Sequence, residues 1–260
     1  MSCYMRQLSA LARLSVLELY RRKDLVVVLV LSLVILAPLL FFTPFGMTGA
    51  SRYMNELALL LVWLFAGVIG LSVAARLFPS EFETRTIFPL LAKPVGRGTV
   101  LLGKYLGALA SALSALVVFY LAYILLTGLR QGIWFSMTLL QAMLLHAAFL
   151  VIIIAVSVLG SLVLTTSANL TLGGFITVGM LMFGQRLSAL ALQQPWPGRW
   201  ILRMIDWFAP HLEFFDMRQR LIHDWPPLGW STCFCVVLYA VCYAALCLTL
   251  AAACFRRRRF

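Results

Sequence analysis

Five uncharged, strongly apolar windows of membrane length dominate this sequence. They cover residues 25–51, 57–75, 105–129, 131–185 and 225–255. About 20 apolar residues in a helix are enough to cross the hydrocarbon core of a bilayer. The fourth window is too long for one crossing, and its polar run Thr-Thr-Ser-Ala-Asn at 165–169 divides it into two. The sequence therefore predicts six membrane-spanning helices.

The composition agrees with this reading, because charged residues make up only 12% of the chain, against about 25% in a typical soluble domain. We expect an all-α integral membrane protein with a single transmembrane domain over residues 1–260. The expected spans are about 25–45, 57–75, 105–129, 137–164, 170–192 and 229–255. Residues 193–227 form an outer segment rich in Trp, a residue favoured at the headgroup level. Its residues Ile201, Met204, Ile205 and Phe208 keep helical spacing, which predicts short helices embedded in the outer interface.

Lys and Arg residues set the expected orientation. If the N-terminus is cytoplasmic, the segments on that side carry fourteen of the 21 Lys and Arg residues, and the outer segments carry seven. Since cytoplasmic loops retain positive charge, we expect both termini to be cytoplasmic. The formal net charge of +12 then reflects topology and contact with anionic membrane lipid, and it indicates no nucleic-acid partner.

The stretch before the first span reads as a helix on the inner membrane surface. Between residues 4 and 22, apolar side chains recur at intervals of three and four, with Arg6 and Arg13 on the other side. The alternative is a basic flank that only anchors the first span.

The connection between spans two and three, residues 76–104, carries a dense mix of both charge signs and three prolines. Residues 79–94 are expected to form a short helix that begins at a Pro-Ser pair. Glu81 and Glu83 lie in its first turn, where the helix dipole favours acidic side chains. Apolar residues at 87–91 give this helix an apolar side. The next helix is expected to begin near residue 99 and to continue into span three.

Two sets of polar residues are candidate sites. His146 lies within span four, and ionisable groups inside a membrane are functional candidates; the alternative is a neutral imidazole that hydrogen-bonds a neighbouring helix. The outer segment carries a set of His and acidic residues, namely His211, Glu213, Asp216, His223 and Asp224. Their spacing matches no compact metal motif, so we expect a solvated loop and no metal site.

The sequence predicts no catalytic site. Residues 98–104 match the first seven positions of a phosphate-binding loop, but Tyr105 stands where the motif needs Ser or Thr to reach magnesium. The stretch also runs directly into a membrane span, so we reject nucleotide binding there. The spans contain no carboxylate that could couple transport to protons or sodium. Transport by this chain would need energy from another chain.

The charged connection resembles the first inner loop of ABC-2-type permeases. The resemblance lies in Glu81-x-Glu83-Thr-Arg-Thr-Ile, then Leu-Leu-Ala-Lys-Pro94-Val-Gly-Arg97-Gly, then Gly-Lys104. It is nearest to the six-span group that includes permeases linked to copper-enzyme maturation. A second similarity is Ala-Pro-His-Leu-Glu-Phe-Phe-Asp at residues 209–216. The layout of nearly the whole chain is similar to this family.

The resemblance implies one permease of an exporter in a bacterial-type inner membrane, paired with a second, identical copy and with two separate ATPase subunits. ATP and magnesium would bind those subunits, and this chain would hold no cofactor. The helix at 4–22 would be a connecting helix, and 79–94 the coupling helix. The coupling residues would be Glu81, Glu83, Arg85, Phe88, Leu91, Pro94 and Arg97. The outer lid would include Pro210, His211, Phe214 and Asp216.

Other classes stay open at this stage. A non-transporting assembly or regulatory membrane subunit would carry the same pattern of spans. A membrane-embedded enzyme is disfavoured, because the spans lack clustered acidic or polar residues. A secondary carrier is disfavoured by the missing buried carboxylates and by the lack of visible inverted repeats.

Overall fold

The computed structural model describes residues 50–83, 96–132, 134–193, 195–223 and 225–257, together with a few isolated positions before residue 50. Every regular element in these ranges is a helix. Residues 84–94 of the expected coupling helix lie outside the described residues, and so do the expected first span (25–45) and the expected surface helix (4–22), apart from those isolated positions. The predictions for them stay predictions.

The described residues form both long and short helices. They are α4 (Ala50–Arg76), α5 (Pro79–Glu83), α7 (Arg97–Gln131), α8 (Met137–Ser161), α9 (Thr166–Gln193), α10 (Gly198–Phe208), η1 (Leu212–Phe215), α11 (Arg218–Ile222) and α12 (Trp230–Arg257). Within the described residues, α4, α7, α8, α9 and α12 are long and apolar enough to cross a membrane. This confirms the all-helical, membrane-spanning character of the chain.

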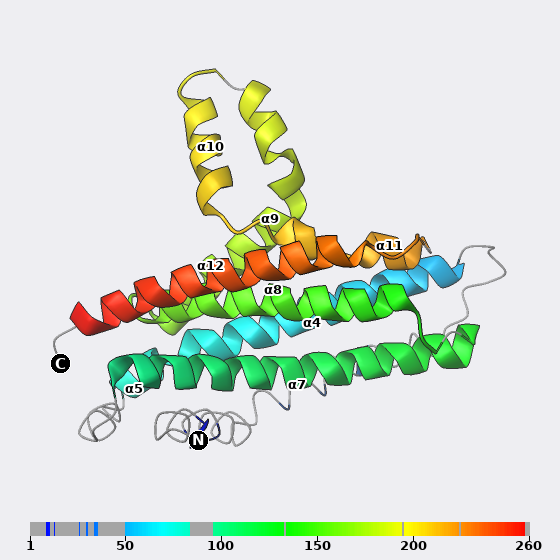
Figure 1. The fold of residues 1–260 in the computed structure, drawn as a ribbon, viewed down its shortest axis with the longest axis horizontal. Helices are drawn as coiled ribbons and strands as arrows, with labels where there is room; N and C mark the ends of the chain where they lie inside the picture. The colour runs from blue at the N-terminus through cyan, green and yellow to red at the C-terminus, as the bar shows by residue number, and fades with distance from the viewer. Residues whose placement is uncertain are drawn as a thin grey trace.

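Helix α8 is the centre of the molecule. It has no charged residue and is apolar on all sides, as expected for a helix surrounded by others. It packs against α4, α7, α9 and α12. In Figure 1, α4, α7, α8 and α12 run along the long axis, with α5 at one end and α11 at the other. We call these the α5 end and the α11 end.

Local sequence signals set the bounds of α7 and α8. The expected helix start near residue 99 is confirmed, because one continuous helix runs from Arg97 through Lys104 to Gln131. Gly132 caps the end of this helix: its backbone N–H donates a hydrogen bond to the Gly128 carbonyl. Its φ of +70° is a conformation that glycine adopts without strain. Helix α8 begins after Ser136, whose hydroxyl accepts a hydrogen bond from the Leu139 N–H at 3.1 Å.

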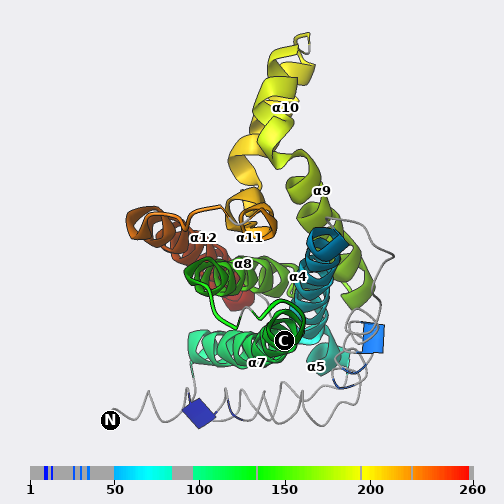
Figure 2. The same ribbon diagram turned by 90° about the vertical axis from the view of Figure 1, so that its right-hand side faces the viewer.

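The end of α9 pairs with α10 and stands away from the other helices (Figures 1 and 2). Helix α9 contains the whole of the expected fifth span at 170–192, and its stretch Thr166–Gly184 is apolar enough to cross a membrane. The expected helix across residues 201–208 is confirmed as α10, and none of its residues is buried. Its large apolar side chains are exposed, which leaves them available to lipid.

The chain then returns to the bundle. Elements η1 and α11 pack against α8, and they also reach α9 and α4, respectively. The buried core is continuous between the bundle and this returning segment, because Leu212, Phe215, Met217 and Ile222 belong to it. The returning segment is therefore part of the packed structure at the α11 end.

Candidate functional site

At the α5 end, a buried lysine ties two elements together. Lys104 of α7 is only 6% exposed and forms an ion pair with Glu81 of α5. Its ammonium also lies 3.4 Å from the Leu77 carbonyl and 5.4 Å from the centre of the Phe78 ring. A buried charge needs such a partner, since an uncompensated one is very costly. Glu81 therefore faces α7 and fixes α5 against it.

A second contact joins α7 to the last helix. The Arg97 guanidinium donates to the carbonyls of Phe255 and Arg256, each at 3.1 Å, where the end of α12 leaves carbonyls without helical partners. The Phe255 ring packs on Phe78, with 5.4 Å between ring centres. The start of α7, the end of α12 and the α4–α5 corner thus meet in one cluster.

At the α11 end, the returning segment carries a well-formed ion pair. Arg218 donates from Nε to Asp216 Oδ1 at 2.9 Å and from Nη2 to Oδ2 at 2.7 Å. These hydrogen bonds raise the pKa of the Arg218 guanidinium, so it stays charged. The guanidinium lies over the ring of Trp63 in α4, 5.6 Å from its centre. The pair therefore places a positive charge on an aromatic face of the bundle.

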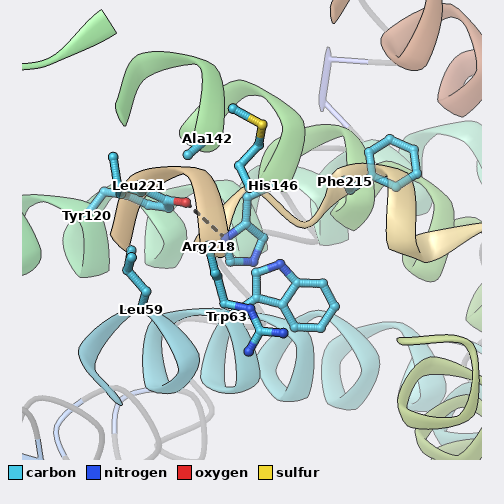
Figure 3. Close-up of a pocket in the computed structure, with 9 residues that line it drawn as sticks. Leu59, Trp63, Tyr120, Ala142, His146, Phe215, Arg218 and Leu221 are labelled. Carbon is cyan, nitrogen blue, oxygen red and sulfur yellow. Dashed lines mark hydrogen bonds between the residues drawn. The ribbon is translucent and has the colours of Figure 1, made fainter. Parts of the chain in front are cut away.

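Beneath Arg218, Trp63 stacks on His146, with 5.6 Å between ring centres (Figure 3). The Tyr120 hydroxyl from α7 lies 3.4 Å from His146 Nδ1. A small cavity of about 10 Å³ opens among these side chains. Helices α4, α7, α8 and α11 thus each contribute a polar or aromatic side chain to one buried cluster, which we call the Trp63–His146 cluster.

Of the expected lid residues, Asp216 pairs with Arg218 of this cluster, and the others make different contacts. His211 Nδ1 pairs with Glu213 Oε1 at 2.9 Å, and the His211 N–H donates to the Tyr239 hydroxyl at 3.0 Å. Pro210 is buried, whereas Phe214 is exposed and packs on the His211 ring. Glu213 is buried against α9, although it belongs to no span.

A match over nearly the whole length decides the family. Residues 21–259 match the family model described as ABC-2 family transporter protein. The chain belongs to the ABC-2 transporter family. No curated protein matches it. Together with the long apolar helices, membership makes the chain an integral membrane protein and a transport permease, a component that typically works with ATPase subunits.

In this ABC-2 permease, only part of the expected coupling set can be placed. Glu81 and Arg97 lie in the cluster at the α5 end, and Glu83 is the last residue of α5. Arg85, Phe88, Leu91 and Pro94 lie outside the described residues. Their role in coupling stays a prediction.

The outer His and acidic residues of the permease do not gather into one site, although His211 and Glu213 pair with each other. His223 is exposed and stacks on Trp225, and Asp224 lies outside the described residues. Across the described ranges, no group of three His, Cys, Asp or Glu residues could hold a metal ion.

Sequence reasoning missed several side-chain contacts of the permease. From the sequence, Arg218 is a basic residue of the outer segment and Trp63 is an aromatic residue of the second span. Only the fold shows that the Arg218 guanidinium lies over the Trp63 ring. Gln141 donates to the Leu228 carbonyl at 2.8 Å and accepts from the Leu228 N–H at 2.9 Å, which ties the start of α12 to α8. The available signal was a Gln within an uncharged window, since buried amides need partners.

Proposed function

We propose that this permease is the membrane subunit of an exporter that is driven by separate ATPase subunits docked on residues 79–94. ATP and magnesium would act on those subunits, and the permease would move the substrate. Two ATPase subunits and two identical permease copies would make the complex. The observation that carries the proposal is the cluster at the α5 end, which links the start of the docking segment to three helices of the bundle.

The cluster offers a physical route for coupling. A displacement of α5 would act on α7 through the Glu81–Lys104 ion pair. Arg97 would pass the movement of α7 to the end of α12 through its two carbonyl contacts. The packing of Phe78 on Phe255 joins the same elements through apolar contact. Packed clusters of this kind move as units, which suits a step driven by a partner.

The opposite end would serve as the outer side. Under this proposal both termini are cytoplasmic, six spans cross a bacterial-type inner membrane, and the segment from α10 to α11 is the outer lid. The exposed apolar side of α10 supports its placement among lipids of the outer interface.

The proposed homodimer would use α9. In α4, a Cβ at Gly67 or Gly70 would meet side chains of α8, so these small residues already serve packing within the chain. In α9, Gly174 and Gly179 have nothing within 4 Å of an added Cβ. Large apolar side chains of the same helix, such as Phe175 and Val178, are exposed. This leaves α9 as a face that a second copy could cover.

The coupling proposal is tested with an affinity-tagged permease purified from its native membrane. The expected result is that MgATP hydrolysis copurifies with the wild-type permease. The double variant Phe88→Ala/Glu83→Ala should lose most of this hydrolysis, because truncating an anchor of a small docking surface costs ~2 kcal/mol or more. Phe234→Ala is the matched control: an exposed Phe of α12, outside the proposed lid, that should leave copurified hydrolysis unchanged.

Two outcomes would count against the proposal. If the double variant retains full ATPase binding and hydrolysis, residues 79–94 are a solvated connector and not a docking segment. If no ATPase copurifies with the wild-type permease, a non-transporting assembly or regulatory role becomes the better reading.

A further inference from the structure

Two buried nitrogens in the Trp63–His146 cluster lack a hydrogen-bond partner among the described residues. They are Trp63 Nε1 and His146 Nε2. Trp63 is 7% exposed and His146 1%, so bulk water does not reach them freely. A buried polar group that makes no hydrogen bond loses its hydration without compensation. Native interiors supply such groups with a partner, either protein or ordered water.

Both residues line the same cavity. Its volume of about 10 Å³ is close to the smallest space that holds one water molecule. Its other walls include Tyr120, Phe215 and Arg218 (Figure 3). The cavity is therefore the right size for one small molecule, and two unpartnered nitrogens are available to bind it.

The hydrogen-bonding properties of the two nitrogens determine which small molecule, here called the guest, could bind in the cavity. The indole Nε1 is only a donor, so the guest must accept a hydrogen bond. The imidazole Nδ1 already lies beside the Tyr120 hydroxyl, so Nε2 is the nitrogen that remains for the guest. Depending on the tautomer, Nε2 donates or accepts, and the guest must be able to do either. Water meets both conditions, whereas a purely donating cation or an apolar molecule does not.

We propose that this cavity holds one ordered water molecule that bridges Trp63 Nε1 of α4 and His146 Nε2 of α8. The water links the two helices directly beneath Arg218, where the returning segment sits on the bundle. It satisfies both nitrogens without charging the imidazole. The inference is independent of the direction of transport and of the ATPase partner.

The hydrogen bond of the Trp63 indole can be read by ultraviolet resonance Raman spectroscopy, in which one indole band responds to hydrogen bonding at Nε1. The purified permease has seven tryptophans, so the spectrum of Trp63→Phe is subtracted from that of the wild type to isolate Trp63. The expected difference spectrum is that of a hydrogen-bonded indole. A free indole N–H in the wild type would overturn the proposal.

A pair of variants at Ala142 separates a bridging water from a direct protein contact. Ala142 lines the cavity and is buried. Ala142→Val should fill the space, expel the water, convert Trp63 to a free N–H and lower the thermal midpoint. Ala142→Ser should keep a hydrogen-bonded indole, because its hydroxyl can replace or retain the water. The smaller Ala142→Cys serves as the filling variant if Ala142→Val does not fold.

Two other results with the variants that fill the cavity would contradict the proposed water. A higher thermal midpoint with an unchanged indole band would mean that the cavity is dry and that filling it improves packing. An indole that stays hydrogen-bonded in a folded Ala142→Val variant would mean that Trp63 bonds the protein directly. Either result would overturn the water site.

Discussion

Gly184 of α9 lies directly against the carboxylate of Glu213 in η1. A Cβ added at Gly184 would lie 2.6 Å from Glu213 Cδ, closer than real Cβ contacts allow. Glu213 is also the partner of His211, and its other oxygen is buried. The absence of a side chain at Gly184 therefore lets the returning segment seat on α9.

The substitution Gly184→Ala should push Glu213 away and weaken the seating of η1. Overpacking of this kind costs about 1–3 kcal/mol, so we expect a lower free energy of unfolding in denaturant titration of the purified permease. Gly98→Ala in α7 is the control, because nothing lies within 4 Å of its added Cβ and it does not belong to the proposed dimer face on α9. Equal effects of the two substitutions would show that helix propensity, not the contact with Glu213, sets the result.

Asn169 holds the turn between α8 and α9. Its amide donates to the Ser157 carbonyl at 2.8 Å, and it is almost completely buried. Asn169→Leu should cost about 1–3 kcal/mol, because it removes a partner from a buried polar group and places a larger side chain close to Gly160. The exposed Ser167→Ala in the same turn should change the unfolding free energy little. Thermal unfolding of both variants would measure this, and an unaffected Asn169→Leu would argue against the hydrogen bond.

The sequence was a good guide to the helices and a poor one to their contacts. The start of α8 follows from Ser136 as its cap, and the end of α7 from a glycine that takes a positive φ; both signals act within a few residues. The Trp63–His146 cluster depends on which faces of α4, α8 and α11 meet. Because α8 is apolar on all sides, its pattern selects no face for His146, and packing with its neighbours decides. The contact of Arg218 with Trp63 likewise depends on which helix faces meet, so the sequence did not show it.

The ion pair between Glu81 and Lys104 gives a prediction for the α5 end. Glu81→Ala leaves the Lys104 ammonium buried without a carboxylate, which should lower the unfolding free energy by roughly 3 kcal/mol. Glu81→Ala/Lys104→Met should recover much of this loss, because the apolar side chain needs no partner. Arg257→Ala at the exposed end of α12 is the control. A double variant that is less stable than Glu81→Ala would contradict the interpretation of a desolvated charge.

The last prediction concerns the proposed dimer face on α9. Val178 is 54% exposed and lies one residue before Gly179, which has open space beside it. In a variant whose six native cysteines are replaced by alanine, Val178→Cys should form a disulfide between two permease chains in the membrane under mild oxidation. Leu246→Cys on α12 is similarly exposed, at 57%, and should form much less of it, since chance collisions alone would join it. Denaturing gel electrophoresis without reductant measures both.

Comparable cross-linking at the two positions would mean that α9 is no preferred interface. Cross-linking at Leu246→Cys alone would move the dimer contact to α12.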